Sequence, residues 1–112
     1  MARQLSPSDT IYVAGHRGLA GSAIWRALEA RGFHNIVGFG SDELDLTDRS
    51  RVMDMVTSIT PDVIIDAAAK VGGIHANNTY PAEFIYQNLQ IQNNVIHAAH
   101  VNDVQKLLFL GS

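Results

Sequence analysis

The stretch IYVAGHRGLAGSAI, residues 11–24, decides how this chain folds. Four apolar residues lead directly into glycines at every third position, Gly15, Gly18 and Gly21. After the turn, apolar residues recur at the spacing of one helical face, at Ala20, Ala23, Ile24, Ala27 and Leu28. This periodicity predicts a short buried strand, a tight glycine turn and an amphipathic helix.

The same alternation of strand and helix continues along the chain. Gly32 is placed to end the first helix. Thr47 or Asp48 can cap the second helix, and Pro61 follows its end. Pro81 suits the first turn of a long third helix. The predicted strands are 11–14, 35–39, 62–66 and 106–112, and the predicted helices are 20–31, 48–59 and 81–99.

Short, unbroken apolar strands are typical of a parallel sheet that helices cover on both faces. With right-handed crossovers, the pattern predicts a Rossmann-type doubly wound α/β fold with the strands in order 3-2-1-4. The first and fourth strands are then neighbours at the switch point, where ligands bind at the carboxyl ends of the strands. The glycine turn and the end of the fourth strand, Leu110 to Ser112, are expected to meet there.

The fourth predicted strand would form a bare sheet edge, because it contains the apolar run LLFL at 107–110. Natural proteins avoid such edges. We therefore interpret residues 11–112 as the N-terminal part of a larger domain, incomplete at the fourth-strand edge, after a ragged start at residues 1–10. The remainder of that domain and a substrate domain are expected outside this chain.

The composition argues against several classes of protein. Apolar residues make up 46% of the 112 residues and charged residues 17%, as in globular proteins. A net charge of −3 without a block of like charges argues against a nucleic-acid partner or an anionic membrane. The lack of cysteine and the spacing of the histidines argue against a metal site. No apolar run approaches a membrane span and no signal peptide is seen, so a cytoplasmic protein is expected.

A glycine triplet between a strand and a helix is the context in which dinucleotides bind. Gly15 permits the sharp turn, Gly18 lets the backbone approach a pyrophosphate, and Gly21 lets the helix pack closely on the strand. His16 and Arg17 lie near the positive end of the helix dipole, where a cation is unfavourable unless an anion binds. The loop therefore predicts a dinucleotide ligand, with a turn that binds nothing as the alternative.

The end of the second predicted strand bears on which dinucleotide binds. NAD sites usually carry an acidic residue there, whereas this chain has Ser41 followed by Asp42. Ser41 can donate to a 2′-phosphate and Arg17 can neutralise it, so NADP(H) is favoured, while Asp42 keeps NAD as an alternative. Asp45 and Leu46 form a candidate adenine-side turn, unless Asp45 only precedes the next helix cap.

Four stretches carry a more specific signal: AGHRGLAGSAI, ELDLTD, AAAKVGGIHANNTYPAEFIYQN and KLLFLGS. Over residues 11–112 they closely resemble the GDP-L-fucose synthases, a family of the extended short-chain dehydrogenase/reductase superfamily. The resemblance implies an NADP(H)-dependent oxidoreductase that epimerises C3 and C5 of a GDP-sugar substrate, GDP-4-keto-6-deoxy-D-mannose, and reduces its C4 ketone. It also implies a homodimer through the helix that begins near Pro81. Another NAD(P)-dependent nucleotide-sugar epimerase or dehydratase, and a non-catalytic dinucleotide sensor, are the alternatives.

The resemblance also assigns roles to residues that match the family's motifs. The glycine loop would bind the NADP pyrophosphate, Arg17 would approach the 2′-phosphate, and Ala68 and Ala69 would line the cofactor ribose. Ser112 matches the catalytic serine, whose hydroxyl hydrogen-bonds the C4 carbonyl of the substrate. Many members carry an arginine where this chain has Ser41, which is a departure. The family's tyrosine and lysine pair lies beyond Ser112, so the chain alone is expected to be inactive.

The sequence thus predicts a site with one catalytic residue, Ser112, and no metal ligand. The candidate cofactor contacts are Gly15, His16, Arg17, Gly18, Leu19, Ala20, Gly21, Ser41, Asp42, Asp45, Leu46, Ala68, Ala69, Leu110 and Gly111.

Overall fold

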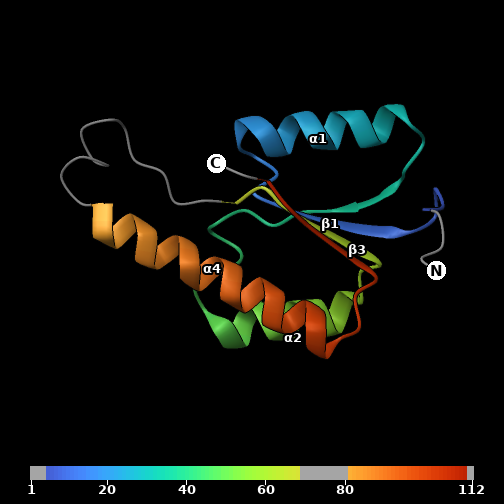
Figure 1. Ribbon diagram of the computed structural model, residues 1–112. Coiled ribbons are helices and arrows are strands. Elements are labelled where there is room, and N and C mark those ends of the chain that lie inside the picture. Colours follow the sequence, from blue (N-terminus) through green and yellow to red (C-terminus); the bar gives the residue numbers. More distant parts are fainter. Residues whose placement is uncertain (1–4, 69–80, 111–112) are drawn as a thin grey trace.

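A computed structural model of the chain describes residues 5–68 and 81–110. Its elements are β1 (Thr10–Ala14), α1 (Leu19–Ala30), β2 (Asn35–Val37), α2 (Arg49–Ile59), β3 (Val63–Asp66), α4 (Pro81–Val101) and β4 (Lys106–Phe109). The strands pair in parallel into one sheet. Helix α1 covers one face of the sheet, and α2 and α4 cover the other (Figure 1). The predicted α/β fold with a doubly wound parallel sheet is confirmed.

The order of the strands differs from the predicted one. The strands run β2-β1-β3-β4 across the sheet, so β3 rather than β4 adjoins β1. In the β1–β3 pair, Ile11 lies opposite Val63 and Ala14 lies opposite Asp66. The prediction of order 3-2-1-4 is therefore wrong. The physical reason is that α2 packs on the face of the sheet opposite α1. A right-handed crossover over that face carries the chain from β2 past β1, so that β3 pairs with the other side of β1. The winding therefore reverses between β1 and β3.

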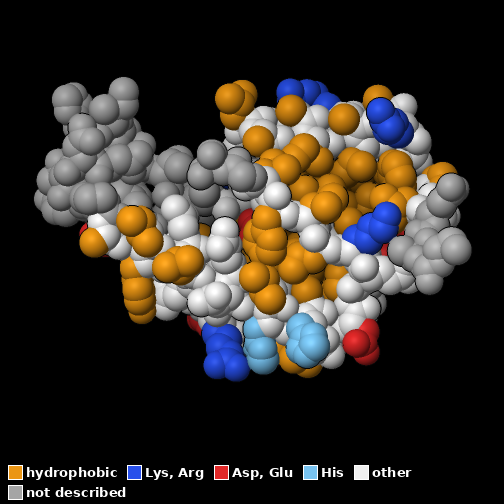
Figure 2. Space-filling model, in the orientation of Figure 1, with side chains coloured by type: hydrophobic (Ala, Val, Ile, Leu, Met, Phe, Trp, Pro, Cys, Tyr) orange, Lys and Arg blue, Asp and Glu red, His pale blue; other side chains and the backbone are white. Residues whose placement is uncertain are grey.

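Strand β4 pairs with β3 and forms an edge of the sheet within residues 5–68 and 81–110. Its apolar side chains are partly open to solvent: Leu108 is 53% exposed, and Leu110, just after the strand, is 44% exposed. Figure 2 shows hydrophobic side chains gathered between α1 and α4, on the side where β4 lies. The predicted apolar edge is therefore present in the described part of the chain.

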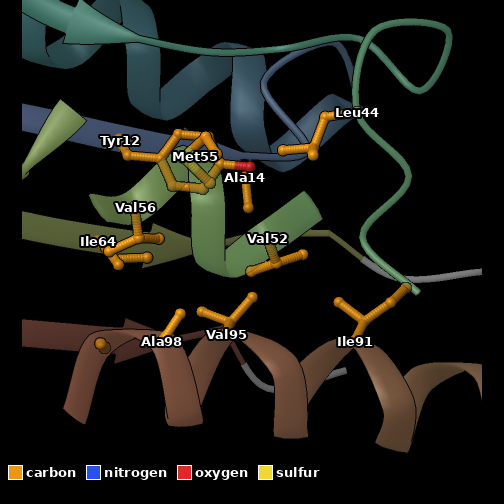
Figure 3. Packing of buried hydrophobic residues seen from close by; sticks show 11 residues of the cluster. Tyr12, Ala14, Leu44, Val52, Met55, Val56, Ile64, Ile91, Val95 and Ala98 are labelled. Carbon is orange, nitrogen blue, oxygen red and sulfur yellow. The ribbon is translucent and has the colours of Figure 1, made fainter. Parts of the chain in front are cut away.

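Two apolar layers hold the helices on the sheet, because successive side chains of a strand point to opposite faces. The layer beneath α1 contains Ile11, Val13, Val63 and Ile65, with Trp25, Leu28, Phe33 and Ile36 packed against it. The layer beneath α2 and α4 contains Tyr12, Ala14, Leu44, Val52, Val56, Ile64, Ile91, Val95 and Ala98 (Figure 3). Burial on both faces explains why the strand sequences are unbroken apolar runs.

The helix ends follow the signals in the sequence. Gly32 lies just beyond α1 with φ of +91°, a left-handed conformation that glycine adopts without strain. The side chain of Asp48 accepts a hydrogen bond from the Arg51 backbone N–H at 3.2 Å, so Asp48, and not Thr47, is the N-cap of α2. Both predicted helix ends are confirmed.

Helix α4 has 21 residues and is the longest element in the described ranges. Neither α4 nor any other described helix is long and apolar enough to cross a membrane. Within the same ranges, His, Asp and Glu side chains form no group of three or more that could hold a metal ion.

Candidate functional site

The glycine turn after β1 is packed so closely that side chains do not fit at two of its positions. Gly15 has φ of +78°, and a Cβ atom there would lie 2.8 Å from the backbone of Ala67 and Ala68, just after β3. A Cβ atom on Gly21 would overlap the carbonyl oxygen of Gly15. Gly18 has more room, and its N–H donates to the Gly15 carbonyl at 3.0 Å. The turn therefore holds the start of α1 against the ends of β1 and β3.

A cleft of about 570 Å³ opens over this turn, at the carboxyl ends of the strands. Eight of the predicted contacts line it: Gly15, His16, Arg17, Gly18, Ser41, Asp45, Leu46 and Ala68. Five further lining residues were not predicted: Phe39, Gly40, Leu44, Ala67 and Ile91. Ile91 has a signal in the sequence, because Ile91, Val95 and Ala98 form a helical stripe that faces the sheet.

Several predicted contacts lie elsewhere. Leu19 is 92% exposed at the start of α1, and neither it nor Ala20, Gly21 or Asp42 lines the cleft. Leu110 donates its backbone N–H to the carbonyl of Asp66, so it lies on the far side of β3 from the glycine turn. The expected adjacency of the first and fourth strands is wrong, because β3 lies between β1 and β4. Ala69, Gly111 and Ser112 lie outside the described residues.

His16 is held by packing rather than by an ion pair. Its ring centroid lies 5.4 Å from that of Trp25 on α1, and a Cβ atom on Gly38 would lie 2.6 Å from its Cγ. Its Nδ1 is buried and has no hydrogen-bond partner among the described residues. Strand β2 ends at Val37, two residues before its predicted end, and Gly38 then lies against this ring. The ring therefore fixes the glycine turn against the end of β2.

Arg17 extends from the glycine turn across the end of β2. Its Nη1 lies 3.4 Å from Oδ1 of Asp42, and its Nη2 lies 3.8 Å from Oε1 of Glu43. All three side chains are more than half exposed, so each ion pair contributes at most about 1 kcal/mol. The guanidinium group thus lies against Gly40, which precedes Ser41 in the sequence.

Hydrogen bonds hold the segment between β2 and α2 in place along the cleft. The Glu43 and Leu44 N–H groups both donate to the Gly40 carbonyl at 2.9 Å. The carboxylate of Asp45 accepts from both the N–H and the hydroxyl of Thr47, which supports the alternative reading that Asp45 shapes the turn before the helix cap. On α4, Asn94 donates from Nδ2 to the Leu46 carbonyl at 2.9 Å. Asn94 is a positioning residue that the sequence did not reveal.

A buried carboxyl group lies just below the cleft wall. Asp66, the last residue of β3, is 3% exposed, and its Oδ1 accepts from the Ala68 N–H at 3.0 Å. Its Oδ2 has no hydrogen-bond partner among the described residues. Burial raises the pKa of Asp66 to about 6, against the lowering effect of the Ala68 hydrogen bond. Burial, and then the charge of Asp66, raise the pKa of Tyr12 above its usual range.

These residues fit a dinucleotide cofactor. Gly18 is the N-cap of α1 and has no side chain to cover the helix N-terminus, which favours a pyrophosphate there. The Cβ atoms that Gly15 and Gly21 lack would fill the turn on which a ligand rests. Arg17 supplies a cation at one end of the cleft, and Leu44 and Ile91 supply apolar surface for a base.

Residues 11–112 match the NAD dependent epimerase/dehydratase family. The chain belongs to this family. Among curated members, the chain is 60% identical over 108 residues to putative GDP-L-fucose synthase 2 of Arabidopsis thaliana, covering 96% of this chain and 33% of that protein. It is also 60% identical over 102 residues to GDP-L-fucose synthase of Escherichia coli K12, covering 91% and 32%. The chain thus spans about a third of the length of these members.

A solved structure of a GDP-sugar reductase has the same fold. It is MlghC, a GDP-mannoheptose C4 reductase from Campylobacter jejuni with NADP bound. The two superimpose with a TM-score of 0.91 at 41% identity, over 96% of this chain and 34% of that one. The observed strand arrangement is therefore shared with a reductase whose structure contains NADP.

Proposed function

We propose that this chain is the NADP-binding portion of a GDP-L-fucose synthase. The whole enzyme would convert GDP-4-keto-6-deoxy-D-mannose to GDP-L-fucose by 3,5-epimerisation and NADPH-dependent 4-reduction. The identity of 60% to curated synthases from both a plant and a bacterium is the observation that carries the proposal.

Within the cleft, each part of the cofactor has a candidate partner. The backbone of Gly15 and Gly18 would take the pyrophosphate at the N-terminus of α1. Arg17 and Ser41 would take the 2′-phosphate, and Asp45 would lie on the adenine side. NADPH, when bound, supplies the hydride for reduction of the ketone.

Ser112 is proposed as the catalytic serine on the family resemblance alone. Its hydroxyl would donate a hydrogen bond to the C4 carbonyl oxygen and stabilise the negative charge that develops there. The predicted pairing of the first and fourth strands gives this role no support, because β3 lies between β1 and β4. Ala69 and Gly111 are likewise proposed cofactor contacts on resemblance.

Helix α4 supports the proposal of a homodimer. Its core-facing side carries Ile91 and Val95, yet its other side is also apolar. The exposed residues there are Ile85, Tyr86, Leu89 and Ile96, between 44% and 64% exposed. Ile85, Leu89 and Ile96 follow the spacing of a helix–helix seam. A second copy of α4 would cover this stripe in a cytoplasmic dimer.

A turnover assay of the full-length protein tests the function. With GDP-4-keto-6-deoxy-D-mannose, we expect consumption of NADPH and formation of GDP-L-fucose, identified by NMR of the product. Reduction of a different 4-keto nucleotide sugar, and not of this one, would show that the protein is another reductase of the family. Dinucleotide binding without turnover of any such sugar would favour a sensor, and both results would overturn the proposal.

A further inference from the structure

Arg17 of the glycine turn lies between two carboxylates of the segment that joins β2 to α2. Arg17 lies 3.4 Å from Asp42 and 3.8 Å from Glu43, measured between their nitrogen and oxygen atoms. Among the described residues that line the cleft, Arg17 is the only lysine or arginine. Arg17, the cation that would bind a 2′-phosphate, is therefore already paired with Asp42 and Glu43 when no ligand is bound.

The two carboxylates differ in how they are held. Glu43 accepts from the Gly40 N–H at 3.1 Å, and Arg51 donates to its backbone carbonyl at 3.1 Å, so Glu43 is part of the turn itself. Within the described residues, the carboxylate of Asp42 has one polar partner, Arg17. Asp42 is 75% exposed, and its Oδ1 and the Arg17 guanidinium both lie over the backbone of Gly40. Among the described residues, Asp42 therefore forms an ion pair with Arg17 but no hydrogen bond that stabilises the turn.

We propose that Asp42 sets how strongly the protein prefers NADPH to NADH, because its carboxylate competes with the 2′-phosphate for Arg17. The inference deepens the proposed function and rests on it. The two carboxylates flank Arg17, which is the only cation that lines the described part of the cleft. A phosphate with about −1.5 to −2 charges is repelled there until Arg17 turns from Asp42 toward it. NADH lacks this phosphate, so the competition does not affect it.

Binding measurements on the full-length protein test the role of Asp42. Dissociation constants for NADPH and NADH are measured by calorimetry for the native protein and for Asp42→Asn. We expect Asp42→Asn to bind NADPH about three- to tenfold more tightly and NADH equally well, since an exposed ion pair is weak. The gain should shrink at high salt, which screens exposed charges.

Two further variants separate competition from other effects. In an Arg17→Ala background, Asp42→Asn should give a smaller gain in NADPH affinity, because the contested cation is gone. Asp54→Asn makes the same chemical change on the exposed side of α2, outside the cleft, and should alter neither affinity. Glu43→Gln keeps an acceptor for the Gly40 N–H and should give a smaller gain than Asp42→Asn, because its oxygen lies farther from Arg17.

The outcomes separate this inference from the proposed function. If the native protein binds NADPH but Asp42→Asn does not tighten it, Asp42 does not compete for Arg17 and the inference alone is wrong. If Asp42→Asn weakens NADH and leaves NADPH unchanged, the carboxylate binds the ribose hydroxyls instead, and the inference is again wrong. If the native protein binds neither dinucleotide, the proposed function is overturned and the inference with it.

Discussion

Asp66 carries a buried carboxyl group on which two influences act in opposite directions. Burial at 3% exposure disfavours its charged form, while the hydrogen bond from the Ala68 N–H favours it. Burial prevails, and the pKa of Asp66 rises from its ordinary value of 3.8 to about 6. The folded protein therefore holds this proton more tightly than the unfolded chain does. The charged form costs stability once the pH exceeds the unfolded pKa, and the cost reaches its full size above the folded pKa.

Replacing Asp66 should therefore stabilise the protein more at high pH than at low pH. Asn keeps an acceptor for the Ala68 N–H and carries no charge. The cost that Asp66→Asn removes is about 3 kcal/mol at pH 8 and roughly half of that at pH 5, from the pKa shift. Urea unfolding of the full-length protein at both pH values measures the difference. The same change in unfolding free energy at pH 5 and pH 8 would show that ionisation of Asp66 is not responsible.

At the scale of elements, the site depends on how closely α1 and α4 approach the loops at the carboxyl end of the sheet. Gly21 brings α1 against the carbonyl of Gly15, and Asn94 ties α4 to the carbonyl of Leu46. The two helices lie on opposite faces of the sheet, so the cleft between the loops is braced from both sides (Figure 1). Substitutions at Gly21 or Asn94 should therefore alter cofactor binding, although neither residue lines the cleft.

Gly21→Ala should force α1 away from the glycine turn. The added methyl group overlaps the Gly15 carbonyl, and overpacking of this kind costs about 1–3 kcal/mol. We expect lower stability and a large loss of NADPH affinity, both measured on the full-length protein. Gly32→Ala is the matched control, because its Cβ atom meets nothing within 4 Å and only its positive φ is strained. Loss of NADPH affinity in Gly32→Ala as well would argue that stability, rather than the approach of α1, governs binding.

Asn94→Ala should loosen the segment at Leu46 along the cleft. The substitution leaves the Leu46 carbonyl without its partner on α4, and the loss of this part-buried hydrogen bond costs about 0.5–1.5 kcal/mol. We expect weaker NADPH binding together with a lower melting temperature. Asn93→Ala makes the same change at an exposed neighbouring position of α4 and should leave both unchanged. Equal changes in NADPH affinity and melting temperature for the two variants would show that the Asn94 hydrogen bond is not responsible.

At the scale of the whole molecule, the described residues leave two apolar surfaces open. One is the edge formed by β4, where Leu108 is 53% exposed, and the other is the outer stripe of α4, where Leu89 is 52% exposed. Exposed apolar surfaces of this kind favour association with other protein surfaces. We propose that the rest of the domain covers β4 and that a second subunit covers α4. The chain spans about a third of the curated members, which is consistent with such additional parts.

Leu108→Lys distinguishes a covered edge from an open one. In the 112-residue chain produced alone, a lysine at this edge should reduce self-association, measured by sedimentation velocity. In the full-length protein, the same substitution should lower stability by about 2–5 kcal/mol, because a charge is then buried beneath the added parts. Unchanged stability of the full-length Leu108→Lys variant would mean that nothing covers β4 there.

Much of the fold and part of the site could be predicted from local signals. The glycine turn, the cap at Asp48 and the helix end at Gly32 each depend on neighbouring residues, so the sequence contains them. His16 was interpreted through its charge, but its ring packs on Trp25. Asn94 bonds to a carbonyl 48 residues away in the chain. Contacts of this kind leave no periodic pattern, and no local rule reveals them.

The sequence by itself determined the alternation of strands and helices, the parallel sheet and the glycine turn, because periodicity and backbone preference act over a few residues. The tertiary structure alone decided that β3, not β4, adjoins β1. Right-handed crossovers permit either order, and the face on which α2 packs selects one of them. That choice depends on burying Val52 and Val56 together with Val95 of α4 in one layer. Burial shared among distant elements is a property of the whole fold, so no segment specifies it alone.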